Sequence, residues 1–186
     1  KGYESGDFIA SAEPTVNETL THFSAGFPLR ILENRALQNA VWCQDLKMKD
    51  FHDFQVMMLC QLKLLKGQAL NIEEKARLKE ILEKTEYRFT VSVCTLMNLQ
   101  RSCLESNWLE GKRLANELKP AVQSLTGLYV QAEYFFYRGI ALLNCYDKSS
   151  LFKKISIKRE LKSILRKMSK WAKSAPANHN HKKVIL

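Results

Sequence analysis

Two histidines near the end of the chain, His179 and His181, come closest to a metal-binding pattern. A zinc site needs three or four ligands at suitable spacing, and no acidic residue or cysteine lies within the fifteen adjacent residues. On a helix, side chains two positions apart also point away from one another. The pair is therefore a weak metal candidate, and a structural or solvent-exposed role is favoured over metal or nuclease chemistry.

The cysteines offer the next possibility for chemistry. They are scattered, odd in number and form no C-x-x-C pair, which indicates buried free thiols in a cytoplasmic protein. The five are Cys43, Cys60, Cys94, Cys103 and Cys145. A catalytic cysteine would need a histidine partner, which the sequence cannot place.

Phosphate-binding and ligand-binding motifs are also weak. Gly6 and Asp7 indicate a turn and a helix cap, because the chain contains neither of the glycine motifs that bind phosphate or dinucleotides. An aromatic set in the range 129–137 favours a core over a ligand box: Tyr129, Tyr134, Phe135, Phe136 and Tyr137. We expect no catalytic residue, no cofactor and no bound metal in this chain.

The positive charge is concentrated at one end. The chain carries a net charge of +10, but residues 148–186 hold twelve Lys or Arg against the single acid Glu160. A stripe at steps of four residues forms a possible partner-binding basic face: Lys154, Lys158, Lys162, Arg166 and Lys170. We favour a solvated face, then an acidic protein partner, and then nucleic acid or an anionic membrane surface.

Helical periodicity must position all these residues, since strand-like alternation is almost absent. We predict helices over residues 7–24, 28–46, 50–65, 71–82, 89–105, 107–120 and 129–146, and a long one from Ser149 or Ser150 to Lys173. A ninth would begin beyond Pro176 with Asn178 as its cap. Asn71 with Glu74, and Asn107 with Glu110, have the spacing of helix N-caps, whereas Gly67 and the Thr126-Gly127 step end helices.

Short turns between such helices predict an all-α fold of stacked antiparallel hairpins. One pair has the residue types of a tetratricopeptide repeat near the expected positions: Trp108, Leu109, Gly111, Ala115 and Pro120. No clean 34-residue period runs along the chain. We therefore expect a degenerate, tetratricopeptide-like α-solenoid of eight or nine helices, with residues 1–186 forming a single helical-repeat segment.

The ends of the chain bear on its context. It has no starting Met, no signal peptide and no apolar run near 18 residues. We expect a cytoplasmic location and a segment excised from a much longer chain.

Four stretches resemble one known family. They are YESGDFIASAEPTVNETLTHFSAGFPL (3–29), LESNWLEGKRLANE (104–117), GLYVQAEYFFYRGIALLNCY (127–146) and MSKWAKSAPANHNHKKVIL (168–186). The last is similar to a motif M-x-x-W-A-x-x-x-P-x-N-x-x-H-K, which Trp171, Pro176, Asn178, His181 and Lys182 match. The chain thus resembles the tetratricopeptide-like helical region of bacterial multidomain signalling proteins.

The resemblance implies a location within a larger protein. In that family a serine/threonine-kinase-like domain and an AAA-type ATPase precede this region, and GAF sensor or histidine kinase domains often follow it. None of the family's ATP-binding or phosphotransfer residues falls in the four stretches, so the chemistry would belong to other domains.

Two non-enzymatic functions remain open from the sequence, and an enzyme is the third option, which turnover of nucleotide by this segment alone would indicate. The first is a non-enzymatic scaffold that docks neighbouring domains of the same chain or a protein partner. The second is an adaptor that binds nucleic acid or an anionic membrane through residues 148–186.

Overall fold

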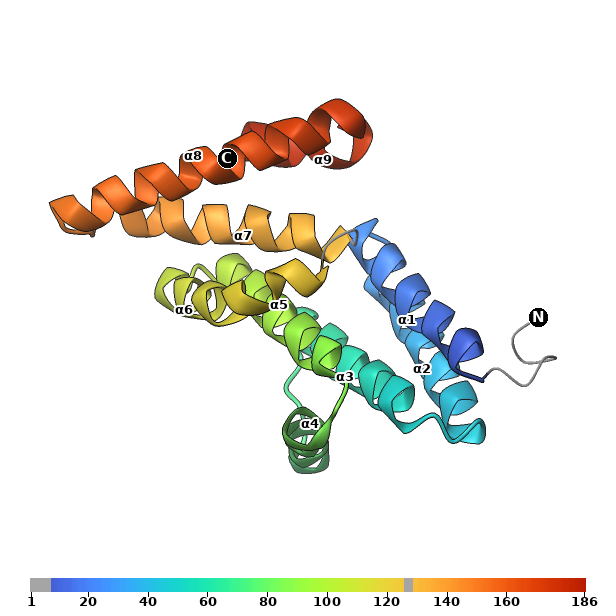
Figure 1. The fold of residues 1–186 in the computed structure, drawn as a ribbon. Helices are drawn as coiled ribbons and strands as arrows, with labels where there is room; N and C mark the ends of the chain where they lie inside the picture. The colour runs from blue at the N-terminus through green and yellow to red at the C-terminus, as the bar shows by residue number, and fades with distance from the viewer. Residues whose placement is uncertain (1–7, 126–128) are drawn as a thin grey trace. The chain divides into compact units, whose positions relative to one another are not determined.

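The computed structural model describes residues 8–125 and 129–186, and these ranges are helical with no strand among them (Figure 1). The helices are α1 (Phe8–Ser24), α2 (Leu29–Asp45), α3 (Lys49–Leu65), α4 (Ile72–Lys84), α5 (Arg88–Leu104), α6 (Trp108–Leu118), the 3₁₀ helix η1 (Lys119–Leu125), α7 (Tyr129–Tyr146), α8 (Leu151–Ser174) and α9 (Pro176–Ile185). Successive helices pack as antiparallel neighbours, so the all-α, hairpin-based fold expected from the sequence is confirmed. The chain divides into two compact units, residues 1–94 and 95–186, with the boundary inside α5.

Local signals in the sequence set most helix ends. The Asn71 side chain accepts a hydrogen bond from the Glu74 backbone N–H at 2.8 Å, and the Glu74 carboxylate accepts one from the Asn71 N–H at 2.9 Å, so α4 begins with a complete capping box. The Asn107 side chain accepts a hydrogen bond from the Glu110 backbone N–H at 3.4 Å and so caps α6. Gly67 follows α3 with a φ of +74°, a conformation that glycine adopts without the steric cost of a Cβ atom.

The predicted cap of α9 is wrong. Asn178 lies inside α9, because Pro176 occupies the first turn of that helix and makes Ala175 the N-cap. Proline suits the first helical position, where its missing N–H costs no intrahelical bond. Ser150 is the N-cap residue of α8, within the predicted range, although its side chain forms no capping hydrogen bond. The Ser149 hydroxyl donates to the Cys145 carbonyl at 2.8 Å. The predicted cap at Gly6-Asp7 and the predicted break at Thr126-Gly127 lie outside the described residues.

In the first unit, α3 is the central element and packs against α1, α2 and α4. Its buried apolar side chains include Phe54, Met57, Met58 and Leu62. Two polar residues are also buried in this unit: Gln55 of α3 and Thr19 of α1 are both fully buried. The Thr19 hydroxyl donates a hydrogen bond to Gln55 Oε1 at 3.1 Å. A buried polar pair of this kind is stable only when both groups find partners.

The second unit is built around α7, which packs against α6 and α8, while α9 runs back along α8 (Figure 1). Its core cluster contains Phe136, Leu142, Ile157, Ile164 and Met168. Of the aromatic set predicted for the core, Tyr134 and Phe136 are buried, and Phe135 and Tyr137 are half-buried. Tyr129, at the first position of α7, is 48% exposed, so the prediction is wrong for that residue.

None of the helices within the described ranges combines the length and the apolarity that a membrane crossing requires.

Candidate functional site

The two histidines of α9 do not converge on a site. His179 is half-buried with its ring centroid 6.1 Å from that of Trp171, and its Nδ1 atom has no hydrogen-bond partner, whereas His181 is exposed. Burial, and then the nearby charge of Lys182, lower the pKa of His179 below its ordinary value of 6.5. Across the described ranges, no group of three or more His, Cys, Asp or Glu side chains is placed to hold a metal ion.

The residues of the M-x-x-W-A motif attach α9 to the rest of the second unit. Lys182 forms an ion pair with Glu133 of α7, and its ammonium lies 6.0 Å from the centre of the Phe136 ring. Trp171 contacts the Phe135 ring at a centroid distance of 5.8 Å. Pro176 and Asn178 are both exposed in the first turn of α9. The motif therefore marks a packing arrangement between helices.

All five cysteines are buried and free. Burial raises the pKa of the Cys43 and Cys60 thiols, and it raises that of Cys103 to about 11. Because the thiolate is the reactive form, these three thiols are poor nucleophiles at neutral pH.

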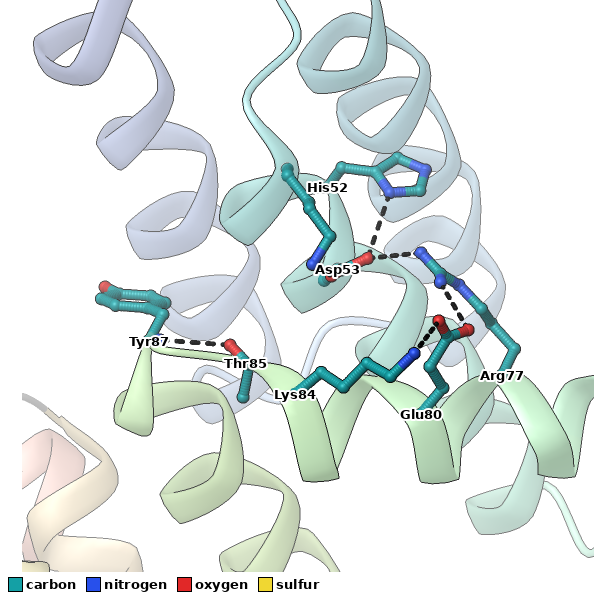
Figure 2. Close-up of polar contacts among 8 residues, drawn as sticks. His52, Asp53, Arg77, Glu80, Lys84, Thr85 and Tyr87 are labelled. Atoms are coloured by element: carbon teal, nitrogen blue, oxygen red, sulfur yellow. Dashed lines mark hydrogen bonds and ion pairs between the residues drawn. The ribbon is translucent and has the colours of Figure 1, made fainter.

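A buried carboxylate lies at the centre of a charge cluster in the first unit (Figure 2). Asp53 of α3 is only 2% exposed, and its oxygens lie 2.6 Å from Arg77 Nη2, 3.5 Å from Lys49 Nζ and 3.5 Å from His52 Nδ1. Arg77 also forms an ion pair with Glu80, as Figure 2 shows, and the distance from Nη1 to Oε2 is 3.0 Å. The cluster joins α4 to α3, and its only signal in the sequence is an acid among the apolar positions of α3.

The second unit has its own buried charge. Arg138 of α7 is 4% exposed, and its Nη2 and Nε atoms each lie 2.6 Å from Glu160 Oε1 of α8. Its Nη1 group donates to the Ala115 carbonyl at 2.8 Å and to the Tyr134 hydroxyl at 3.1 Å. The guanidinium thereby connects α6, α7 and α8. Sequence reasoning missed this role because Arg138 lies in a largely apolar helix.

The predicted basic face of α8 splits into two parts. The Lys154 and Lys158 ammonium groups lie 5.2 and 5.6 Å from the centre of the Tyr146 ring. Lys162, Arg166 and Lys170 instead line a shallow groove of about 400 Å³ with Lys173, Leu165 and Ser169. The split has a geometric cause: with about 3.6 residues per turn, each step of four residues rotates a side chain by about 40° around the axis.

The groove, hereafter the α8 groove, carries uncompensated charge. Lys162, Arg166, Lys170 and Lys173 are all exposed, and none of them forms an ion pair with any residue in the described ranges. Glu160 is the one acid on α8, and Arg138 engages it. Lys173 was not among the face residues expected from the sequence.

A second concave surface lies where the α5–α6 and α7–α8 turns meet. This pocket, hereafter the turn pocket, has a volume of about 360 Å³. Apolar, cationic and small polar side chains share its lining: Ser106, Asn107, Trp108, Leu109, Lys112, Asn144, Cys145, Lys148, Ser149, Ser150 and Lys153. No carboxylate of the described residues lines it. This pocket could not be predicted from the sequence, because it depends on which two turns come together.

Comparison with known proteins adds no relative: the chain matches no family model, no curated protein and no solved structure. The resemblance to bacterial signalling proteins therefore stays a prediction. The candidate sites are the two concave surfaces of the second unit, and exposed or half-buried cations line both.

Proposed function

We propose that this chain is a non-enzymatic helical docking scaffold whose α8 groove binds an acidic segment of a protein partner. One observation carries the proposal: four exposed cations line the groove without an ion partner in the described part of the chain. Grouped charges of one sign raise the local concentration of an oppositely charged partner and speed its association.

The uses of the other charges support binding at this surface. The buried charges Asp53 and Arg138 are engaged in joining helices, and Lys182 holds α9 to α7. The α8 groove is different because its cations contact no carboxylate there and leave their charge facing solvent. An acidic partner would supply the negative charge that compensates these cations.

Following the sequence resemblance, the scaffold would belong to a bacterial signalling protein and lie between an ATPase module and a sensor or kinase module. The partner would then be a neighbouring domain of the same chain or another protein of the pathway. The sequence of the full-length gene product tests this placement directly, since the modules would flank the segment.

The docking proposal is tested with a polyglutamate peptide of about 20 residues, whose binding should weaken steeply with added salt. The charge-reversed variant Lys162→Glu/Arg166→Glu/Lys170→Glu should bind it at least about tenfold more weakly. A matched control, Lys75→Glu/Lys119→Glu/Lys183→Glu, changes three exposed lysines elsewhere by the same net charge. Equal losses in the two variants would show that only the overall charge matters and would contradict docking at the α8 groove.

A second candidate is an adaptor for anionic membranes. Leu151 and Phe152, in the first turn of α8, are 79% and 87% exposed and adjoin Lys153 and Lys154. Exposed apolar side chains beside lysines bind the surface of anionic bilayers. Vesicles of phosphatidylserine and phosphatidylcholine test this reading: tight binding to them that Phe152→Ser abolishes, without binding to polyglutamate, would favour the adaptor over the scaffold.

A further inference from the structure

We propose that the turn pocket is a second docking site, which takes a large apolar side chain of a protein partner together with the acidic residues that flank it. The inference rests on the docking role proposed above but uses a different surface and different lysines. The occupant is an acidic peptide segment with a Phe-like or Leu-like anchor.

The pocket is open because small side chains border it. Ser106, Ser149 and Ser150 occupy the two turns. Ser106 has a φ of +58°, so the chain reverses sharply between α5 and α6 before Asn107 caps α6. The volume of about 360 Å³ suits one large side chain with part of its backbone.

The apolar part of the pocket is partly exposed to solvent. Trp108 is half-buried and Leu109 is 78% exposed, although both lie in the first turn of a helix packed against α7. Exposed aromatic and aliphatic side chains within a concave surface are typical anchoring points for a partner. An apolar side chain bound here would cover both residues.

The charged part of the pocket favours a partner with negative charge. Lys112, Lys148 and Lys153 line it, and none forms an ion pair within the described ranges. Two nearby carboxylates are already engaged, since Glu105 lies 3.5 Å from Arg101 and Glu110 lies 2.7 Å from Arg113. Asp147 is exposed beside the pocket but does not line it. The uncompensated charge at the pocket is therefore positive.

The shape favours a peptide over a bilayer or a nucleic acid. A bilayer accepts side chains that protrude, whereas Trp108 lies in the wall of a cavity. A nucleic-acid surface requires a run of cations that follows the phosphates, and these three lysines instead surround an apolar surface. A peptide with one apolar side chain and acidic residues on both sides of it matches all of these features.

Trp108 gives a direct readout. The variant Trp42→Phe/Trp171→Phe leaves Trp108 as the single tryptophan of the chain, and its fluorescence should change on titration with a synthetic hexapeptide of five glutamates and one central phenylalanine. Calorimetry on the Lys162→Glu/Arg166→Glu/Lys170→Glu variant, which keeps all three tryptophans, measures the affinity of the turn pocket without the background substitutions and without binding at the α8 groove. A peptide with lysines in place of the glutamates, and one with alanine in place of the phenylalanine, should each bind at least about tenfold more weakly.

Variants separate this site from the α8 groove. Lys112→Glu/Lys148→Glu/Lys153→Glu should weaken the peptide at least about tenfold, while Lys162→Glu/Arg166→Glu/Lys170→Glu should change it by less than about twofold. The proposal is overturned if Trp108 shows no saturable response up to about 1 mM peptide, if both variants lose binding equally, or if phosphatidylserine vesicles bind and the peptide does not. A silent Trp108 with intact polyglutamate binding at the α8 groove would remove this site and leave the proposed function standing.

Discussion

The two partners of the buried ion pair in the second unit should respond unequally to substitution. Glu160→Ala removes the more exposed partner, at 29% against 4% for Arg138, yet it should be the more destabilising change. It leaves a buried guanidinium whose remaining hydrogen bonds to the described residues run from Nη1 to the Ala115 carbonyl and the Tyr134 hydroxyl. Arg138→Met removes the buried charge itself, and the carboxylate left behind can turn to water.

The expected magnitudes follow from that asymmetry. An uncompensated buried charge costs about 3–5 kcal/mol, and the two retained hydrogen bonds place Glu160→Ala near about 3 kcal/mol of lost unfolding free energy. Replacement of the charge by an apolar side chain of similar length should cost about 1 kcal/mol for Arg138→Met. The double variant Arg138→Met/Glu160→Met should recover most of the loss seen with Glu160→Ala.

Urea unfolding followed by tryptophan fluorescence measures these differences. A Trp42→Phe background restricts the signal to Trp108 and Trp171, which both belong to the second unit. Glu117→Ala is the control, because Glu117 pairs with Arg113 at the surface and should give no measurable change. A larger loss for Arg138→Met than for Glu160→Ala would refute the reasoning, since it would mean that the guanidinium contributes more than its burial costs.

Two further outcomes are expected. Because burial lowers the pKa of His179, the unfolded chain binds more protons than the folded one as pH falls through 6.5, so the second unit should lose stability there. Urea titrations at pH 7.5 and pH 5.5 measure this loss of unfolding free energy, and His179→Asn should reduce it. An unchanged pH dependence in the variant would contradict the assignment. Gly111→Ala should raise the unfolding free energy by about 0.5–1 kcal/mol, because alanine favours a helix over glycine. The added Cβ has room, since its nearest neighbours, Ala141 Cβ and Cys103 Sγ, lie at an ordinary contact distance of 3.5 Å. A drop in melting temperature would show that α6 needs glycine for close packing.

Sequence reasoning succeeded where the signal is local. The capping box at Asn71, the stop at Gly67 and the bounds of α7 each depend on a few neighbouring residues, and the structure has them as expected. The same logic predicts Asn178 as a cap, but the proline two positions earlier already begins the helix. Two local signals compete there, and the proline determines where the helix starts.

The functional surfaces were less accessible from sequence, because they depend on how helices are rotated and paired. A four-residue spacing placed five cations on one face, whereas the helix turns two of them toward Tyr146. The bond from Arg77 to Asp53 spans 24 residues, and the one from Arg138 to Glu160 spans 22. Neither partner can be chosen without knowing which helices are neighbours and in what register.

The buried bond between Thr19 and Gln55 has a consequence for the uniqueness of the first unit. Apolar side chains alone would tolerate α1 sliding along α3 by one turn, a shift of about 5.4 Å. Such a slide would take the Gln55 carboxamide away from the Thr19 and Thr15 hydroxyls, at a cost of about 1–3 kcal/mol for an unsatisfied buried group, whereas the Thr19 hydroxyl would keep its bond to the Thr15 carbonyl within α1. The bonds between Gln55 and α1 therefore favour one alignment of the two helices, and mutating Thr19 and Gln55 to apolar residues should give a unit that is equally stable but loses its single defined arrangement.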